Sequence, residues 1–512
     1  MPINITIPQR IIKAIKENWI FLLIYLFFFY VASRSPVGGD DWEIATWYRN
    51  GAVSSFIGNI RTWAYFNGRV FNNLFDAMFS FYRGLWVVIS PLAHAGTLYF
   101  ISKTLKYKNN TFAVLVTFVM LLCVSIDMRA QIHFHTVANI SYTFPICIIF
   151  FYIYLINRDI SGHGMVIFSS KRFNGAIYSV LALTASLWIE NLTIGFMAVL
   201  LVYLVKSVTK KTSIPLSIKC GLIGGFIGTA FMFSSIGISA RIGHNISIVE
   251  TITKNYKTVL DDLVNSSLLM YAIYALIAIW AIKCGIIALR KPSKIIMMSF
   301  FSAITTLIIL KVLLGLLEEN SFLFTANANR WINTNVFSLS GKNIVPVSIS
   351  ILLLFSMFVP ITCVKDTDVF IPLYIMAIFS AIPMVLSPGA RNMMLSQYVL
   401  IALVGYLASK ITFRKSDYKK LALILVTAML LIRMENYAFY LEEAQRVTKF
   451  REALISEYKA DVIYANGASG FVLLLPKYRE DVFIPNLQSD YYIESIKNYY
   501  DLPKESIIHF VD

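Results

Sequence analysis

Charged residues are scarce in this chain of 512 residues. They make up only 14% of it, whereas 57% of the residues are hydrophobic and the mean hydropathy is +0.66. A soluble domain of this length does not have so little polar sequence with which to cover its surface. The short alternating segments of a membrane β-barrel are also missing. These absences exclude a water-soluble fold and favour apolar helices.

Cysteine frameworks and phosphate-binding glycine motifs are lacking as well. The five cysteines lie within or at the edge of apolar segments rather than in loops: Cys123, Cys147, Cys220, Cys284 and Cys363. This placement argues against a disulfide framework and against a CxxC metal site. We also find no convincing glycine-rich nucleotide loop and no internal repeat, and the missing repeat removes a main sequence sign of a symmetric transporter.

Apolar runs of membrane-spanning length recur along the chain. A helix needs about 20 apolar residues to cross a hydrocarbon core about 30 Å thick. The runs predict about thirteen transmembrane helices. They lie near residues 18–33, 84–102, 110–127, 140–157, 174–189, 191–207, 214–237, 267–288, 295–316, 345–363, 370–387, 395–410 and 419–433. The predicted fold class is an all-α polytopic membrane protein.

The formal net charge of +16 comes from basic residues in short loops, which is a topogenic pattern and not a footprint for nucleic acid. These basic loops alternate along the chain and, with the basic N-terminus, they predict a cytoplasmic N-terminus. The first apolar run has no small-residue cleavage site, so we interpret it as a transmembrane helix. The predicted orientation of the later spans depends on the short turn at residues 188–191 (WIEN). If one kinked helix crossed this turn, every later loop would face the opposite side of the membrane.

The sequence divides into two parts. Residues 1–433 form the predicted transmembrane domain, which includes an outer loop at 34–83, and residues 434–512 form an outer C-terminal domain. In the latter, a helix precedes the strand-like strings DVIYA, VFIP and IIHFV and the helical string SDYYIESIKNYY, which is typical of a small α/β domain. Because its core is small, we expect it to pack onto the membrane part.

Two adjacent acids, Asp40 and Asp41, follow the first span in the string GGDDWE. One could act as a general base on an acceptor hydroxyl, while the other orients that hydroxyl or holds a divalent cation. The same acids, with Glu43, would also suit the first turn of a helix. Because we place the pair in a loop, we expect replacement by Asn to leave folding intact.

The same loop carries aromatic, amide and charged side chains. Trp63, Asn67 and Arg69 are a mixture that binds sugars, because aromatic faces cover the apolar side of a sugar ring and amides bond its hydroxyls. An aromatic belt at the membrane surface would use Trp63 equally well. Glu190 lies between two apolar spans, where a carboxylate is costly unless it faces a polar cavity.

Further candidates lie near the predicted ends of spans. Arg241 and Arg391 are at the depth of lipid phosphates, where either could hold a phosphate leaving group. His133 and His135 share a face only in an extended segment, and no third ligand accompanies them, so we predict no metal site. His94, inside a span, is typical of a residue that forms a hydrogen bond between helices.

This arrangement resembles the C-type-fold glycosyltransferases that use polyprenyl-phosphate sugars. The strings DDW, FNGR, ANISYTFPI, WIEN and SPGAR are similar to those of bacterial O-antigen glucosyltransferases of the serotype-conversion kind. The resemblance implies inverting transfer of a sugar such as glucose from undecaprenyl phosphate to O-antigen or another envelope glycan. Transfer would occur at the periplasmic face of the inner membrane, with Asp40 or Asp41 as the base. The partners would be the lipid-linked donor, the glycan acceptor and membrane lipids, and no cofactor beyond a divalent cation is implied.

Two other functions stay open at this point. A transporter or flippase of lipid-linked oligosaccharides predicts ionisable residues deep in several spans. Here the acids collect at one face, which favours the enzyme. An O-antigen polymerase would use the same face but would rely on arginine-rich outer loops more than on an early acidic pair.

Overall fold

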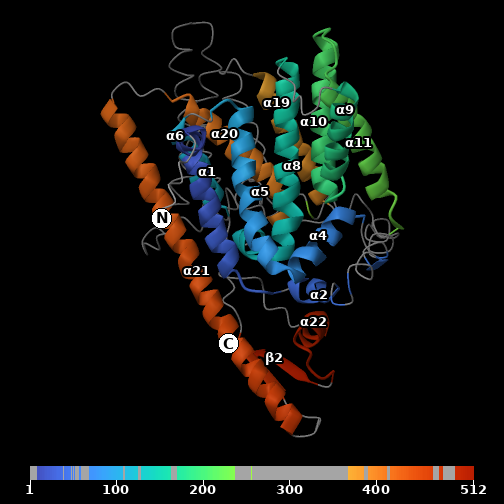
Figure 1. Cartoon of the computed structure of the whole chain (residues 1–512), viewed down its shortest axis with the longest axis vertical. Coiled ribbons are helices and arrows are strands. Elements are labelled where there is room, and N and C mark those ends of the chain that lie inside the picture. The colour runs from blue at the N-terminus through green and yellow to red at the C-terminus, as the bar shows by residue number, and fades with distance from the viewer. Residues whose placement is uncertain are drawn as a thin grey trace, which may run out of the picture.

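The computed structural model describes most of the chain outside residues 237–366. The described residues are 9–38, 40–47, 49, 51, 57–58, 61, 68–107, 110–124, 128–162, 170–236, 255, 367–385, 390–411, 416–464, 472–476, 490–504 and 506–511. Within them the chain is mostly helical, and its helices form a bundle flanked by one long C-terminal helix (Figure 1).

The elements follow one another in a simple order. Helices come first: α1 (Gln9–Arg34), α2 (Asp40–Trp47), α4 (Val70–Phe81), α5 (Arg83–Thr104), α6 (Thr111–Leu122), the π-helix η1 (Arg129–Phe134), α8 (Thr136–Ile160), α9 (Lys171–Ala185), α10 (Glu190–Thr209) and α11 (Leu216–Phe233). Then follow α19 (Thr367–Ala381), the 3-10 helices η4 (Ile382–Val385) and η5 (Ala390–Met393), α20 (Met394–Ser409), α21 (Ser416–Tyr464), β1 (Val472–Pro476), α22 (Asp490–Tyr500) and β2 (Ile507–Val511).

Six of the described helices are long and apolar enough to cross a membrane. They cover Glu17–Arg34, Arg83–Thr104, Thr136–Ile160, Glu190–Thr209, Leu216–Phe233 and part of Ser416–Lys459. Their sequences confirm the predicted spans at 18–33, 84–102, 140–157, 191–207, 214–237 and 419–433 as apolar helices. The predicted spans at 110–127, 370–387 and 395–410 contain shorter apolar helices, whereas the span predicted at 174–189 corresponds to α9 (Lys171–Ala185), which is too short to be one of the six and too polar to be one of these shorter helices. Those at 267–288, 295–316 and 345–363 lie outside the described residues.

The turn at residues 188–191 separates two antiparallel helices, as predicted. A Cβ at Gly224 of α11 would overlap the carbonyl oxygen of Ser179, and Gly175 lies against Cys220, so α9 and α11 run parallel. Thr193 and Met232 form a contact at the opposite ends of α10 and α11, so these two helices run antiparallel. The glycines of α11 permit this close backbone approach, as small residues do between membrane helices. One kinked helix across the turn is thereby ruled out.

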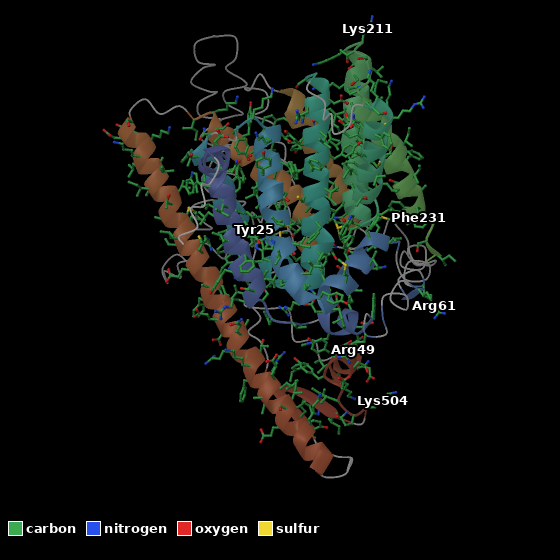
Figure 2. The ribbon with its side chains drawn as sticks, in the orientation of Figure 1. Tyr25, Arg49, Arg61, Lys211, Phe231 and Lys504 are labelled. Carbon is green, nitrogen blue, oxygen red and sulfur yellow. The ribbon has the colours of Figure 1, made fainter. Side chains whose placement is uncertain are left out.

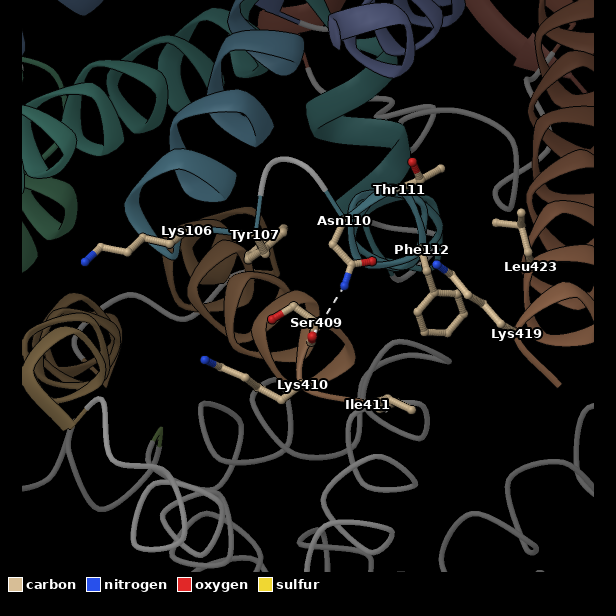
Figure 3. A pocket seen from close by; sticks show the side chains of 10 residues that line it. All are labelled: Lys106, Tyr107, Asn110, Thr111, Phe112, Ser409, Lys410, Ile411, Lys419 and Leu423. Carbon is tan, nitrogen blue, oxygen red and sulfur yellow. Dashed lines mark hydrogen bonds between the residues drawn. The ribbon is translucent and has the colours of Figure 1, made fainter. Parts of the chain in front are cut away.

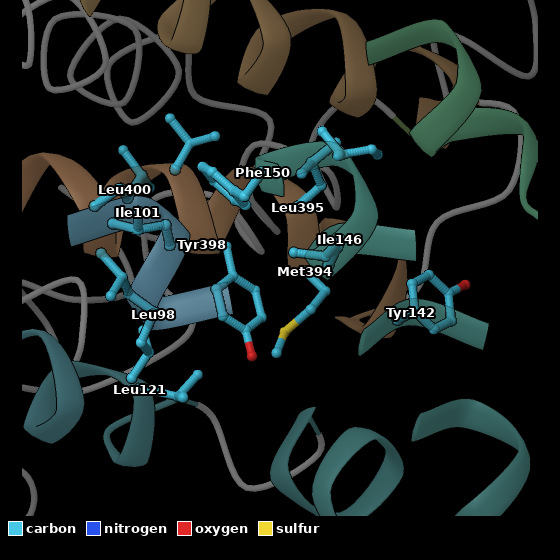
Figure 4. Packing of buried hydrophobic residues seen from close by; sticks show 14 of the residues in the cluster. Leu98, Ile101, Leu121, Tyr142, Ile146, Phe150, Met394, Leu395, Tyr398 and Leu400 are labelled. Atoms are coloured by element: carbon cyan, nitrogen blue, oxygen red, sulfur yellow. The ribbon is translucent and has the colours of Figure 1, made fainter. Parts of the chain in front are cut away.

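The bundle core is formed where α5, α6, α8 and α20 meet. Leu98, Ile146 and Tyr398, from three of these helices, are almost fully buried and face one another across the centre (Figure 4). Apolar side chains on α1 close the same cluster on one side. The bundle has two ends (Figure 1). We call the end next to α2 the α2 end, and the opposite end, where α6 begins and α20 ends, the α6/α20 end.

The C-terminal segment holds a two-stranded parallel sheet. β1 pairs with β2 in the register Val472↔Ile507 through Pro476↔Val511, and α22 lies between the strands in sequence. The helix predicted at SDYYIESIKNYY and the strand at IIHFV are confirmed, and VFIP lies outside the described residues. The strand predicted at DVIYA is wrong, because Asp461–Tyr464 continues α21. Local β propensity is a weak signal against propagation of an existing helix.

This segment packs onto the α2 end, as its small core led us to expect. Trp42 of α2 is buried together with Tyr458 of α21, Leu475 of β1 and Phe510 of β2. α21 has 49 residues, which corresponds to about 73 Å of helix, so it passes along the bundle and continues to the sheet. Figure 2 shows Arg49 and Lys504 in this region, far from Lys211 at the other end.

Candidate functional site

Asp41 is buried and holds the start of another helix. Its two carboxylate oxygens accept hydrogen bonds from the backbone amides of Val137, at 2.9 Å, and Thr136, at 3.3 Å. These amides belong to the first turn of α8, where they have no partner within the helix and the helix dipole favours a negative charge. His135 Nε2 lies 3.3 Å from the same carboxylate and donates a hydrogen bond to the carbonyl oxygen of Gly38 at 2.8 Å.

Asp40 and Asp41 are adjacent but differ in environment. Both lie in the first turn of α2 with Glu43, so the alternative interpretation as helix-starting residues is confirmed. Asp41 is 1% exposed, whereas Asp40 is only partly buried. The expectation that either acid could be replaced without affecting packing is wrong for Asp41, because its carboxylate joins α2 to α8. Burial and the charge of Asp40 raise the pKa of Glu43.

Asp76 of α4 adds a third buried carboxyl group to this end. Its Oδ2 accepts hydrogen bonds from Asn72 Nδ2 at 2.5 Å and from Ser141 Oγ at 3.3 Å. Its Oδ1 is buried and has no hydrogen-bond partner in the described part of the chain. Burial raises the pKa of Asp76 well above its usual value, and the charges of Asp41 and Asp40 act in the same direction. The folded protein therefore favours the protonated form of this carboxyl group more than water does.

Arg69 and Glu190, both predicted site residues, bind each other. Arg69 Nε lies 3.1 Å from each carboxylate oxygen of Glu190, and Nη2 lies 2.8 Å from Oε2. Burial alone would lower the pKa of Arg69, but Glu190 outweighs it and the pKa is raised. The backbone is joined at the same place, where the Phe71 amide donates to the Leu187 carbonyl oxygen at 3.3 Å. The start of α4 is thereby tied to the turn before α10.

The segment that carries Arg391 reaches the same region. Asn191, next to Glu190, donates a hydrogen bond from Nδ2 to the backbone oxygen of Asn392 at 2.7 Å. The hydroxyl of Tyr142 also donates to Asn392 Oδ1. η5 therefore holds the backbone of Arg391 beside the Arg69–Glu190 pair. Trp63, Asn67 and Arg241 lie outside the described residues, so their assignment stays a prediction.

His133 and His135, two residues apart, contact different parts of the chain. His133 Nδ1 lies 2.7 Å from the hydroxyl of Tyr437, while His135 is bonded to Gly38, so the two rings have different partners. The segment is a π-helix from residue 129 to 134, and only His135 is extended. Among the described residues, no group of three or more His, Cys, Asp or Glu side chains could hold a metal ion.

His94 belongs to a polar network between helices, as its position in a span predicted. Its Nδ1 lies 3.2 Å from the hydroxyl of Tyr398, and its Nε2 lies 3.1 Å from Asn139 Nδ2. Asn139 Oδ1 in turn accepts a hydrogen bond from Trp86 Nε1 at 3.1 Å. The network joins α5, α8 and α20 inside the bundle. Such bonds satisfy polar groups where no water competes.

Arg129, the first residue of η1, had no predicted role. It is 4% exposed, and its guanidinium carbon lies 4.1 Å from the ring centroid of Tyr440 and 5.3 Å from that of Tyr437. Its Nε and Nη2 have no hydrogen-bond acceptor in the described structure. Among the described residues no carboxylate pairs with it, and because a buried cation without a counterion is costly, this residue is a candidate for contact with an anion. The sequence sign that could have identified Arg129 is its position as a charged residue in a largely apolar segment.

Comparison of the chain with protein-family models, with curated proteins and with solved structures finds no significant match. The class of protein therefore follows from the described helices and side chains. Six apolar helices support a multi-pass membrane protein. At the α2 end, this bundle gathers two buried carboxyl groups, one partly exposed carboxylate and a partly buried ion pair.

Proposed function

We propose that this chain is a membrane glycosyltransferase that moves a sugar from a polyprenyl phosphate to an envelope glycan. The observation that carries the proposal is the grouping of Asp40, Asp76 and the Arg69–Glu190 pair at one end of an apolar helix bundle. A lipid-linked donor reaches a protein through the bilayer, so a polar site at the end of membrane helices is where its head group would arrive.

Asp40 is the favoured general base. Both oxygens of Asp41 accept hydrogen bonds from α8, and a proton acceptor that is already occupied in this way is a poor base. Asp40 lies beside it and is partly exposed. In the proposed step, Asp40 takes the proton of the acceptor hydroxyl while that oxygen attacks the anomeric carbon. The bond from this carbon to the phosphate oxygen breaks, and the phosphate leaves with the electron pair, which inverts the configuration.

The remaining residues have positioning roles in this proposal. Asp41 fixes α2, and therefore Asp40, against the start of α8. Arg69 and Glu190 hold the loop before α4 at the η5 region, and a cation at this place can bind sugar hydroxyls or phosphate oxygens. Arg391, or Arg241, would neutralise the departing phosphate. No nucleotide is needed, because the donor already carries its sugar on a lipid phosphate.

The finer architecture belongs to the same proposal. It includes about thirteen transmembrane helices in a C-type glycosyltransferase arrangement, with the N-terminus in the cytoplasm and the α2 end and C-terminal segment in the periplasm of a bacterial inner membrane. The distribution of lysines supports this orientation, because Lys106, Lys211 and Lys410 all lie at the α6/α20 side of the bundle.

A second candidate, a transporter of lipid-linked oligosaccharides, is favoured by one observation. The buried network of His94, Asn139 and Tyr398 crosses the bundle, and transporters use polar groups deep in their spans. The polar groups of this network are hydrogen-bonded to one another within the protein. A purely structural role therefore explains the network as well as transport does. The carboxyl groups of Asp40, Asp41 and Asp76 lie in α2 and α4, outside the six helices that could cross a membrane, and this placement favours the enzyme.

A transfer assay distinguishes the two candidates. Purified protein is incubated with undecaprenyl-phosphate glucose carrying radiolabelled sugar and with extracted envelope glycan, and label in the glycan is counted. We expect transfer by the unaltered protein and its loss in Asp40→Asn with the folded protein retained. Labelled lipid that crosses the membrane of proteoliposomes, without any transfer to glycan, would instead establish the transporter. Full transfer by Asp40→Asn would exclude Asp40 as the base.

A further inference from the structure

The α6/α20 end contains a cavity that the proposed function does not use. Its volume is about 680 Å³, and it lies where the turn after α5, the start of α6, the end of α20 and the start of α21 meet. It is lined by Lys106, Tyr107, Asn110, Thr111, Phe112, Ser409, Lys410, Ile411, Lys419 and Leu423 (Figure 3). It is large enough for a phosphorylated head group rather than for a single ion or a few waters.

The described charged residues that line this cavity are all cationic. Lys106, Lys410 and Lys419 line it, and no Asp or Glu occurs among its ten described lining residues. Asp417, an acid close in sequence to Lys419, lies 3.9 Å from Lys420 and does not line the cavity. Like charges that share one cavity repel one another, so an anion inside it would be stabilised by all three.

The frame of the cavity is fixed by hydrogen bonds. Asn110 accepts a hydrogen bond from the Ala113 amide at 3.2 Å and so begins α6, and its Nδ2 donates to the Ser409 carbonyl oxygen at 3.3 Å (Figure 3). A Cβ at Gly405 would overlap Thr117, so α6 and α20 are in close contact. The cavity is therefore a built feature between two packed helix ends and not a gap between mobile side chains.

Its walls also indicate the kind of ligand. Phe112, Ile411 and Leu423 give the cavity apolar sides next to its lysines. From the same place, α21 continues with exposed apolar side chains such as Leu421 and Leu425. Apolar helices begin or end here, so the membrane boundary falls at this depth. A lipid head group has the matching chemistry, with phosphate at the boundary and glycerol and acyl chains below it.

We propose that this cavity binds the phosphate of an anionic phospholipid such as phosphatidylglycerol, with Lys106, Lys410 and Lys419 as its cationic ligands. The positive-inside tendency explains why loops at this end are basic. It does not require three lysines from three separate segments to surround one cavity with apolar walls. Basic pockets between membrane helices are suited to anionic head groups, and each lysine near an anionic lipid adds to the affinity. The proposal is independent of the reaction at the α2 end.

The test is lipid binding by the full-length protein in mild detergent. The protein is titrated with phosphatidylglycerol, with zwitterionic phosphatidylcholine or with inorganic phosphate, and bound molecules are measured by native mass spectrometry. We expect retention of phosphatidylglycerol over the other two probes. Replacing the three lysines together (Lys106→Gln, Lys410→Gln and Lys419→Gln) should weaken its binding roughly a hundredfold, given a factor of about five for each lysine.

A matched control uses three exposed lysines at the same end that do not line the cavity. The triple change Lys171→Gln, Lys210→Gln and Lys211→Gln removes the same charge and should leave binding unchanged. Replacing the three cavity lysines by arginine should keep binding, which separates charge from folding. Equal loss in the control triple, or equal retention of phosphatidylcholine, would overturn the proposal. Displacement of phosphatidylglycerol by inorganic phosphate would assign the cavity to a soluble anion and overturn the lipid assignment.

Discussion

At the α2 end of the bundle, Asp41 and the Arg69–Glu190 pair are largely buried and bonded to helices far away in the sequence, whereas at the α6/α20 end Lys106 and Lys410 are exposed around a cavity. A buried charge must be compensated by nearby groups, because removing it from water is costly. An exposed lysine needs no such partner. The stability of the α2 end therefore depends on specific contacts between its side chains. At the α6/α20 end, the total positive charge matters more than any single contact.

The largest difference between the two ends should appear when Asp41 is changed. Asp41→Ala leaves two α8 amides without their acceptor, so we expect the free energy of unfolding to fall by about 2–4 kcal/mol. Thermal and denaturant unfolding of the purified protein in detergent measures this. The matched change Lys419→Ala at the other end should alter stability by less than about 0.5 kcal/mol. Equal effects of the two changes would remove the contrast.

A double-mutant cycle on Arg69 and Glu190 tests the next largest contact. Each side chain is about one-quarter exposed or less, and removal of either leaves the other charge partly buried. We expect Arg69→Met and Glu190→Gln each to cost about 2 kcal/mol and the double variant to cost less than their sum. Additive losses would mean that the two residues stabilise the loop separately. A further loss of sugar transfer, with KM raised more than kcat is lowered, would assign the pair to substrate binding.

Features encoded locally could be predicted from the sequence. The apolar runs placed the helices, and the string WIEN marked the break between α9 and α10, because both depend on the residues within one segment. The grouping of acids at one end of the bundle also followed from the order of spans. The extension of α21 through Asp461–Tyr464 did not, since the helix continues beyond side chains that pack on the sheet, such as Tyr458.

The contacts that form the candidate site could not be predicted in this way. Arg69 and Glu190 are 121 positions apart, and Asp41 and Val137 are 96 apart. Nothing in one sequence links such positions, because their contact depends on how α2, α4 and α8 pack. The choice between Asp40 and Asp41 depends on the same packing, since the adjacent acids differ only in burial and partners. Sequence reasoning identified the chemical groups, and tertiary structure assigned their environments.

The buried carboxyl group of Asp76 predicts a smaller, pH-dependent effect. Its folded-state pKa is raised, so above about pH 4 the unfolded chain loses a proton that the folded protein keeps. This contribution to stability therefore falls as pH rises, by at most about 1.4 kcal/mol per pH unit, until the pH exceeds the folded-state pKa. Asp76→Asn should remove this fall, so the variant gains stability over the unaltered protein between pH 4 and 7. The measurement is the unfolding midpoint of both proteins as a function of pH. If the two midpoints change with pH in parallel, Asp76 does not have a raised pKa in the folded protein.

The smallest effect is expected for Arg49, the exposed ion pair at the α2 end. Arg49 Nη1 lies 2.7 Å from Asp501, but the two side chains are 38% and 75% exposed, so water and salt screen their attraction. Arg49 also donates hydrogen bonds to the carbonyl oxygens of Asn498 and Tyr499 at the end of α22. We expect Arg49→Ala to cost less than about 1 kcal/mol and Asp501→Asn still less, with both losses shrinking at high salt in unfolding experiments. A salt-independent loss as large as that of Asp41→Ala would show that burial does not decide which charges at this end matter.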